Sequence, residues 1–193
     1  MPEYPLVLVA GLGNPGQSYA RTRHNAGFMV IDELADEFKI AVDKNKFNNY
    51  FGRGRIHGSN IVLAKPQAFM NRSGPPLRQI ADYFRIQREA VVIVHDDIDL
   101  AFERLKIKEK GGDGGHKGIR SVIEAFGGND FVRVRMGVGR SVYNTDVVDH
   151  VLSDFCSEEQ SKLNVFLHRA CQAVITVLCN GTKEAMNQFN QNP

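Results

Sequence analysis

VLVAGLGNPGQSYARTRHNAG, residues 7–27, is the stretch that decides the fold expected for this chain of 193 residues. It begins in a short apolar run of the kind that forms a buried strand. The run then breaks into a turn rich in glycine that contains Asn14 and Pro15. Apolar residues at helical spacing from Phe28 to Phe38 predict a helix directly afterwards. Polar side chains between a strand end and a helix start lie where open α/β sheets bind their ligands.

The glycines of this turn, Gly11, Gly13 and Gly16, spell the G-x-G-x-x-G fingerprint of dinucleotide-binding folds. That fingerprint places its last glycine inside the helix start and an acidic residue about 20 positions later, at a second strand end. Here more loop residues follow Gly16, and the next acids lie within the predicted helix. Pro15 also lacks the backbone N–H that a phosphate would use. A nicotinamide cofactor is therefore not expected, and a purely structural turn is the alternative for each residue taken singly.

Two more buried strands are predicted to end in clusters of polar residues. A hairpin over residues 48–65 leads into KPQAFMNRSG, residues 65–74, and then into a helix that begins near Pro75. The β-branched run of residues 91–94 leads into HDDIDL, residues 95–100. Three strands with polar residues at their ends favour one shared pocket at one edge of the sheet.

A glycine-rich loop, GGDGGHKG at residues 111–118, opens another predicted helix. Its backbone N–H groups and the helix N-terminus suit a phosphate or a carboxylate. The loop is not a P-loop, because the G-K-[ST] ending is missing. In the last third, Ser157 and Gln160 predict a capping box before a long amphipathic helix, and Thr182 is expected to cap a short final one.

Composition restricts the class of protein. An apolar share of 42% is enough for a core, and no stretch approaches the ~20 apolar residues of a membrane helix. The first residues lack the features of a signal peptide. Cys156, Cys171 and Cys179 form an odd set without metal-type spacing, which predicts buried free thiols in a reducing cytoplasm. We expect a single α/β domain over residues 1–193, with a twisted, mixed, mostly parallel sheet and helices on both faces.

Positive charge is concentrated in one part of the chain. Residues 104–140 hold nine Lys and Arg against four Asp and Glu, so this segment carries +5 and the remainder −3 of a net charge of +2. Alternating patterns at residues 104–108 and 132–136 predict two half-buried strands that carry basic residues on one face: Lys106, Lys108, Arg133 and Arg135. A confined basic surface favours contact with a polyanion such as nucleic acid. A solvated surface of mixed charge is the alternative.

The strand ends bring together His24, Asn14, Asn71 and Asp96 as candidates for one pocket. A neutral histidine beside a buried carboxylate can activate water, and asparagine amides can donate to a developing oxyanion. No serine or cysteine stands in a nucleophile-elbow setting, which favours direct attack by water. A metal site remains an alternative, although the spacing of its candidate ligands matches no usual pattern: His95, Asp96, Asp97, Asp99 and His116.

Four blocks of this sequence resemble the signature blocks of the bacterial peptidyl-tRNA hydrolases, in the same order: GLGNPGQSYARTRHNAG, KPQAFMNRSG, HDDIDL and GGDGGHKGIRS. The resemblance runs essentially from end to end. It implies an enzyme without a cofactor or metal that hydrolyses the ester between a peptide and the 3′ ribose of tRNA, recycling tRNA during translation. We accordingly expect a cytoplasmic monomer whose partner is tRNA and not a membrane.

The resemblance also implies roles for individual residues. By motif position, His24 is similar to the catalytic base and Asp96 to the acid that orients it. Asn14 and Asn71 resemble the amides that position the substrate. Two further residues are expected to line the same cleft, Tyr19 and Met70, and the basic strand residues are expected to contact the acceptor-stem backbone.

The chain departs from the family pattern at three positions. His116 keeps its place in the motif, but Lys117 stands where the family usually has asparagine, in GGHNG. Ala68 replaces a usual threonine, and Glu103 a usual glycine. Lys117 adds a donor and a charge but loses an acceptor, so we expect it to contact a phosphate.

Two other functions are alternatives to the hydrolysis of peptidyl-tRNA. The first is a non-catalytic RNA-binding relative, since this fold also serves in organelle RNA splicing. The complete set of candidate catalytic residues argues against it. The second is an α/β hydrolase of small molecules, which the basic segment disfavours.

Overall fold

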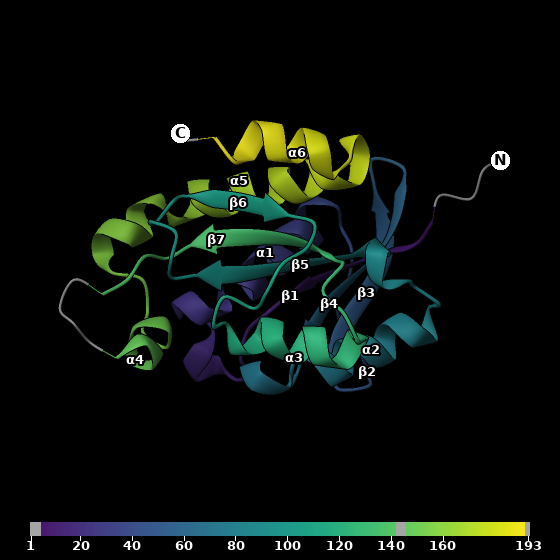
Figure 1. Cartoon of the computed structure of the whole chain (residues 1–193), viewed down its shortest axis with the longest axis horizontal. Helices are drawn as coiled ribbons and strands as arrows, with labels where there is room; N and C mark the ends of the chain where they lie inside the picture. Colours follow the sequence, from purple (N-terminus) through teal and green to yellow (C-terminus); the bar gives the residue numbers. More distant parts are fainter. Residues whose placement is uncertain (1–4, 142–145, 192–193) are drawn as a thin grey trace.

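One seven-stranded sheet organises the computed structural model, which describes residues 5–141 and 146–191 (Figure 1). At its centre β1 lies between β4 and β5. From one edge to the other, the strands are β2 (Lys44–Lys46), β3 (Asn49–Ile56), β4 (Ser59–Pro66), β1 (Val7–Gly11), β5 (Val91–Asp97), β7 (Val132–Gly137) and β6 (Leu105–Lys108).

The sheet is mixed, as predicted, but its parallel part is confined to the centre. β4, β1, β5 and β7 run parallel, which gives three parallel pairings. The three outer pairings, β2 with β3, β3 with β4, and β6 with β7, are antiparallel. The α/β class is therefore confirmed, while "mostly parallel" describes the four central strands and not the whole sheet.

Helices cover both faces of the sheet (Figure 1). On one face, side chains such as Val9 pack in a core with α1 (Ala26–Glu37), α5 (Ser157–Asn180) and α6 (Thr182–Phe189). On the other face, Leu8 packs in a second core with α2 (Gly74–Tyr83) and α3 (Lys117–Phe126). Because neighbouring residues of one strand enter different cores, β1 reads as a continuous apolar run instead of an alternating one.

The turn after β1 is compact because the chain passes very close to helix α1. A Cβ placed on Gly11 would lie 2.1 Å from the main-chain oxygen of Gly27, so no larger residue fits there. Two short 3₁₀ helices, η1 (Gln17–Tyr19) and η2 (Arg23–Asn25), fill the segment that precedes α1. This geometry carries the polar residues of the opening stretch back over the end of β1.

Several details differ from the sequence-based expectation. The N-cap of α5 is Cys156, whose partner in the capping box is Glu159, and not the predicted Ser157 with Gln160. Thr182 is the first residue of α6 and makes no side-chain cap. The short strand β2 and the five-residue helix α4 (Val147–Val151) were not predicted.

The expectation of buried thiols holds for Cys171 alone, because Cys156 and Cys179 are exposed. The strand β7 is also not half-buried, since it lies between β5 and β6 and most of its residues are buried. None of the helices in the described parts of the chain is long and apolar enough to cross a membrane.

Candidate active site

A cleft of about 880 Å³ opens at the carboxyl ends of β1 and β5. All three polar strand ends singled out in the sequence contribute to it, together with the glycine-rich loop before α3. Its lining includes His24, Asp96, Asn14, Asn71, Tyr19, Met70, His116, Lys117, Lys108, Arg133 and Arg135. Of the predicted site residues, only Lys106 is missing from this lining.

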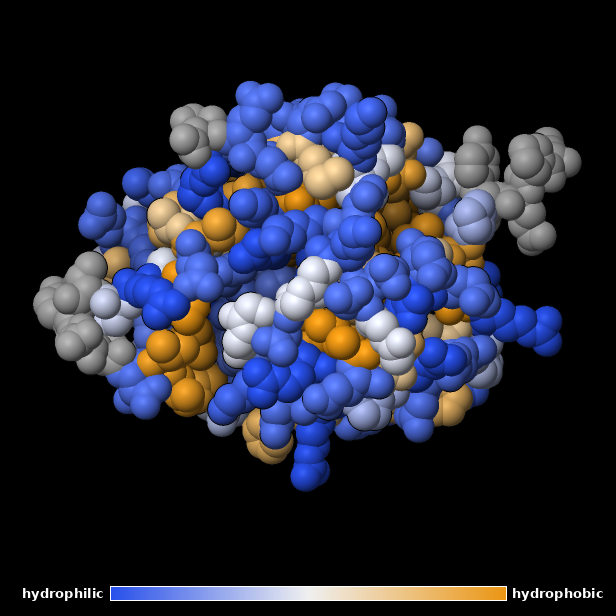
Figure 2. Space-filling view, viewed as in Figure 1, coloured by the Kyte–Doolittle hydropathy of each residue, from blue (hydrophilic) through white to orange (hydrophobic). Residues whose placement is uncertain are grey.

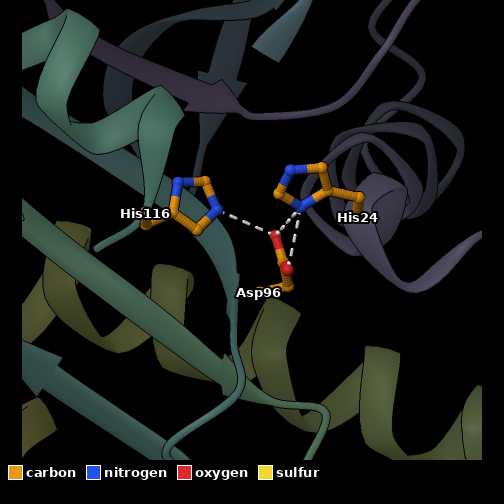
Figure 3. A group of neighbouring side chains, drawn as sticks. All are labelled: His24, Asp96 and His116. Carbon is orange, nitrogen blue, oxygen red and sulfur yellow. Dashed lines mark hydrogen bonds and ion pairs between the residues drawn. The ribbon is translucent and has the colours of Figure 1, made fainter. Parts of the chain in front are cut away.

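At the centre of the cleft, one carboxylate binds two histidines (Figure 3). His24 Nδ1 lies 2.9 Å from both carboxylate oxygens of Asp96. His116 Nε2 lies 2.9 Å from Asp96 Oδ1. His24 comes from η2, Asp96 from β5, and His116 is the N-cap of α3. Segments separated by 72 and 20 residues therefore meet on one carboxylate.

Hydrogen bonding fixes the protonation pattern of the group. His116 Nδ1 accepts from the backbone N–H groups of Gly118 and Ile119, at 3.1 and 3.2 Å. A neutral His116 therefore carries its proton on Nε2 and donates it to Asp96. His24 donates from Nδ1 to the same carboxylate, which leaves its Nε2 as an acceptor. Figure 3 shows this second nitrogen of His24 pointing away from Asp96.

Asp96 is ionised in this setting. Its side chain is 2% exposed, and burial by itself raises the pKa of a carboxyl. The positive charge that His24 and His116 carry when protonated, together with their hydrogen bonds, outweighs that effect and lowers the pKa of Asp96 well below its ordinary value. A buried carboxylate is thus available to stabilise positive charge on either histidine.

His95 lies behind this group and plays a different part. Its ring is buried, 4.7 Å from the ring of His116 between centroids, and its Nδ1 donates to the main-chain oxygen of Asp96 at 2.6 Å. Burial, with the neighbouring His116, lowers the pKa of His95 well below its ordinary value, so His95 is neutral. His95 is thus an almost fully buried, neutral part of the cleft lining that packs against His116.

The geometry does not favour the metal site considered from the sequence. Asp97 pairs with Arg135 and Asp99 with Arg140, so these acids turn to other partners. The ligand atoms of His24, Asp96 and His116 do lie within 4.8 Å of one another. However, a cation on His116 Nε2 would have to displace the proton that the backbone contacts of Nδ1 keep there. The donor set fits a hydrogen-bonded group better than a metal centre.

Asn14 is held by hydrogen bonds that leave its side-chain nitrogen, Nδ2, available. Its Oδ1 accepts from the backbone N–H of Met70 at 2.8 Å, and its main chain exchanges two hydrogen bonds with the side chain of Asn25. Within the described residues, its Nδ2 has no hydrogen-bond partner. Asn71 is exposed in η3 (Met70–Arg72), beside the buried Met70. Two amide side chains thus line one wall of the cleft.

Lys117 is the first residue of α3 and lies exposed in the cleft lining, directly after His116. No acidic side chain of the described residues forms an ion pair with it. A cation at a helix N-terminus is unfavourable with respect to the helix dipole. An anionic ligand at this position would therefore be attracted by both the ammonium and the backbone N–H groups.

The four predicted basic strand residues share one sheet face but differ in exposure. Lys106 lies opposite Arg135, and Lys108 opposite Arg133. The lysines are exposed, whereas Arg133 is only 3% exposed and donates to the main-chain oxygens of Gly111 and Gly112. Arg135 is paired with Asp97 at 2.5 Å. The two arginines therefore bind other groups of the protein in the cleft lining, and the two lysines are the exposed cations of this set.

Several apolar residues that line the cleft were not predicted from the sequence. Phe69 is 58% exposed and meets Tyr19 edge to face, with 6.5 Å between ring centroids. Val147 and Val148 of α4, each 45% exposed, form another wall, and Figure 2 shows an apolar patch at the position of α4. The signal for α4 was Asp146, which caps the helix by accepting from the N–H of Val148.

Comparisons with known proteins agree with this architecture. The family model described as peptidyl-tRNA hydrolase matches residues 8–193. The peptidyl-tRNA hydrolase of Bacillus subtilis (strain 168) is 42% identical over 185 residues, which are 96% of this chain and 98% of the relative. That of Bacillus velezensis is 43% identical over 187 residues, covering 97% of this chain and all of the relative.

A solved structure agrees as well. The crystal structure of peptidyl-tRNA hydrolase from Acinetobacter baumannii superposes with a TM-score of 0.88 at 38% identity. The match covers 96% of this chain and 94% of that one.

Proposed function

The chain belongs to the peptidyl-tRNA hydrolase family, and on that premise we propose that His24 activates a water molecule that hydrolyses the ester between peptide and tRNA. The observation that carries the proposal is the bond from His24 Nδ1 to both oxygens of Asp96, at 2.9 Å. It leaves Nε2 of His24 free to accept a proton from water in the cleft.

Asp96 supports the base in two ways. Its carboxylate holds His24 in the tautomer that carries a proton on Nδ1, and it stabilises the imidazolium that forms when Nε2 takes the proton from water. The second hydrogen bond, from His116, holds the carboxylate in place from the other side. Attack by the resulting hydroxide on the ester carbonyl releases the peptide as an acid and returns the proton to the 3′ oxygen of the ribose.

Asn14 and Asn71 are proposed to position the ester. The Oδ1 of Asn14 is already bound by the N–H of Met70, so its Nδ2 is oriented as a donor for an ester or oxyanion oxygen. Tyr19, Met70 and His116 complete the lining around the reacting group.

The RNA half of the substrate is proposed to lie at the other end of the cleft. Lys106 and Lys108 are exposed on the same sheet face, and Lys117 is exposed in the cleft lining directly after His116. Lysine ammonium groups suit the phosphates of an acceptor stem as point charges. Arg133 and Arg135 are proposed to support tRNA binding through the positive potential of the cleft. Arg133 also fixes the glycine-rich loop, because it donates to the main-chain oxygens of Gly111 and Gly112.

Release of peptide from an N-acetylated aminoacyl-tRNA tests the proposal. Loss of a general base costs about 10²–10⁴ in rate, so His24→Ala should lose most turnover while still binding tRNA. His168→Ala is the matched control, because His168 is an exposed histidine of α5 paired with Glu33, away from the cleft. Wild-type turnover in His24→Ala would refute the role of His24, and tRNA binding without any turnover by the wild type would favour a non-catalytic RNA-binding protein. Gel filtration tests the accompanying proposal of a monomer, and cell fractionation that of a cytoplasmic location.

A further inference from the structure

Two arginines of the opening stretch lie two positions apart but differ sharply in exposure. The side chain of Arg21 is 82% exposed, whereas that of Arg23 is 7% exposed. Arg23 directly precedes His24 in η2. Burying a guanidinium is costly unless its N–H groups are bound, so the partners of Arg23 indicate what its burial serves.

The guanidinium of Arg23 binds one short segment of the chain and the start of α5. Its Nη1 donates to Ser153 Oγ and to the main-chain oxygen of Asp154, each at 2.7 Å. The same nitrogen lies 3.3 and 3.4 Å from the main-chain oxygens of Ser153 and His150. Its Nη2 donates to Glu159 at 2.5 Å.

The main chain reinforces the same connection. The backbone N–H of Arg23 donates to the oxygen of Ser153 at 3.1 Å. Thr22 and Asp154 form an isolated antiparallel bridge. The guanidinium carbon of Arg23 also lies 5.4 Å from the centre of the Phe155 ring. The turn that carries His24 is thus attached to residues 150–155.

Those residues are the last two of α4 and the four that follow it, and α4 supplies an apolar wall of the cleft. Val147, Val148, Val151 and Leu152 line the cleft, and only Val151 is buried. A helix of five residues with so little buried surface depends on other ties for its position. Arg23 contacts the main-chain oxygen of His150 in the last turn of α4 and binds those of Ser153 and Asp154 just beyond the helix, where a cation is also favoured by the helix dipole.

His24 itself has separate supports. Its ring is held by Asp96, and the next residue, Asn25, is fixed by two hydrogen bonds to the main chain of Asn14. Loss of the Arg23 side chain should therefore displace α4 more than it displaces the base.

We infer that Arg23 is a positioning residue that fixes the apolar α4 wall relative to His24, and that this wall contacts the peptide half of the substrate. The chemistry of the wall matches a peptide, whose side chains can be apolar, better than RNA, which carries a charge on every phosphate. The exposed lysines lie on β6 and α3, not on this wall. The inference rests on the proposed function, because it assigns the two halves of that substrate to two parts of one cleft.

Steady-state kinetics of Arg23→Gln on two substrates tests the inference. One substrate is an N-acetylated aminoacyl-tRNA, and the other is the same tRNA carrying a longer apolar peptide. For the longer peptide, KM should rise about tenfold with kcat within about twofold, because uniform binding is lost. For the shorter substrate, KM should change little. Arg23→Lys should show part of the effect, since an ammonium cannot reach every acceptor of the planar guanidinium.

Arg88→Gln is the matched control. Arg88 also binds main-chain oxygens, those of Phe126 and Gly127, but it lies in η4 (Arg88–Ala90) before the amino end of β5. It should lower stability without changing either KM. If Arg23→Gln does not fold, Ser153→Ala removes one 2.7 Å contact and should raise KM for the longer peptide about two- to threefold.

A purely structural role would reduce the fraction of active enzyme, so kcat would fall equally for both substrates while both KM values stayed constant. That result overturns the inference, as does an equal rise of KM for both substrates. If the wild type hydrolyses both substrates and Arg23→Gln leaves the difference between their KM values unchanged, only the role of Arg23 is wrong. If the wild type hydrolyses neither, the proposed function fails together with the inference.

Discussion

The two ends of the cleft are built on opposite principles. At the histidine end, the side-chain atoms of Asp96, His24 and His116 that face one another are joined by hydrogen bonds of 2.9 Å, and the carboxylate is buried. At the basic end, Lys108 and Lys117 line the cleft and Lys106 lies on the same strand as Lys108, outside the lining; all three are exposed and form no ion pair within the described residues. The first arrangement acts through fixed geometry and the second through charge in solvent. Single substitutions should therefore have large effects at one end and small, salt-dependent effects at the other.

The largest effect is expected for Asp96→Asn. The amide would donate to His24 Nδ1, which places the remaining proton on Nε2 and removes the acceptor that water needs. We expect kcat to fall about 10²–10⁴-fold while KM for tRNA substrates stays within a few-fold. Steady-state kinetics at saturating substrate measure this. A kcat close to that of the wild type would show that the carboxylate does not orient the base.

The same substitution changes how stability depends on pH. Because the pKa of Asp96 is lowered in the folded protein, its carboxylate stabilises the fold above the ordinary carboxyl pKa of about 4. That contribution is lost as pH falls below this value toward the lower pKa of the folded state. In urea unfolding, the free energy of unfolding should fall less between pH 7 and pH 3 for Asp96→Asn than for the wild type. Equal losses would mean that the carboxylate is not held by the two histidines.

The sequence predicted the histidine end better than the basic end, for physical reasons. Parallel neighbouring strands bring their carboxyl ends together, so polar residues after β1 and β5 could be expected to meet. Alternation along β7 could not show that the strand lies inside the sheet, where Arg133 and Arg135 bind protein groups. Likewise, nothing in the local sequence separates the buried Arg23 from Arg21, because the partners of Arg23 lie more than 120 residues away.

A smaller effect is expected at the two exposed lysines of β6. Lys106→Ala or Lys108→Ala should weaken tRNA binding a few-fold and flatten the dependence of log affinity on log salt by about one unit per lost phosphate contact. Lys183→Ala is a matched control, because Lys183 is an exposed lysine of α6 on the other face of the sheet. Binding measured at two salt concentrations decides this. Slopes that match the wild type in both variants would remove the β6 lysines from the tRNA surface.

Substitution of Lys117 tests whether this residue belongs to the phosphate-binding or to the catalytic part of the cleft. If its ammonium contacts a phosphate, Lys117→Asn should raise KM and flatten the salt dependence while sparing kcat. Kinetics of this variant at two salt concentrations measure both quantities. A fall in kcat at constant KM would instead place Lys117 with the catalytic group.

The smallest effect is expected outside the cleft, at Glu103. Its backbone has a φ of +68°, which costs about 1 kcal/mol for a residue with a Cβ. Glu103→Gly and Glu103→Ala both lose the ion pair with Lys162, so their difference isolates the backbone strain. The glycine variant should be more stable than the alanine variant by about 1 kcal/mol in urea unfolding, with unchanged kinetics. Equal stability would show that the left-handed backbone costs nothing here.

Single-turnover hydrolysis combined with tRNA binding tests the separation of the two ends most directly. The account predicts that His24→Ala slows the reaction about 10²–10⁴-fold at saturating enzyme with an unchanged Kd for tRNA, and that Lys106→Ala/Lys108→Ala raises Kd with an unchanged rate. A variant that carries all three changes should show both effects at their full size, since distant sites act independently. A wild-type single-turnover rate in His24→Ala would contradict the account.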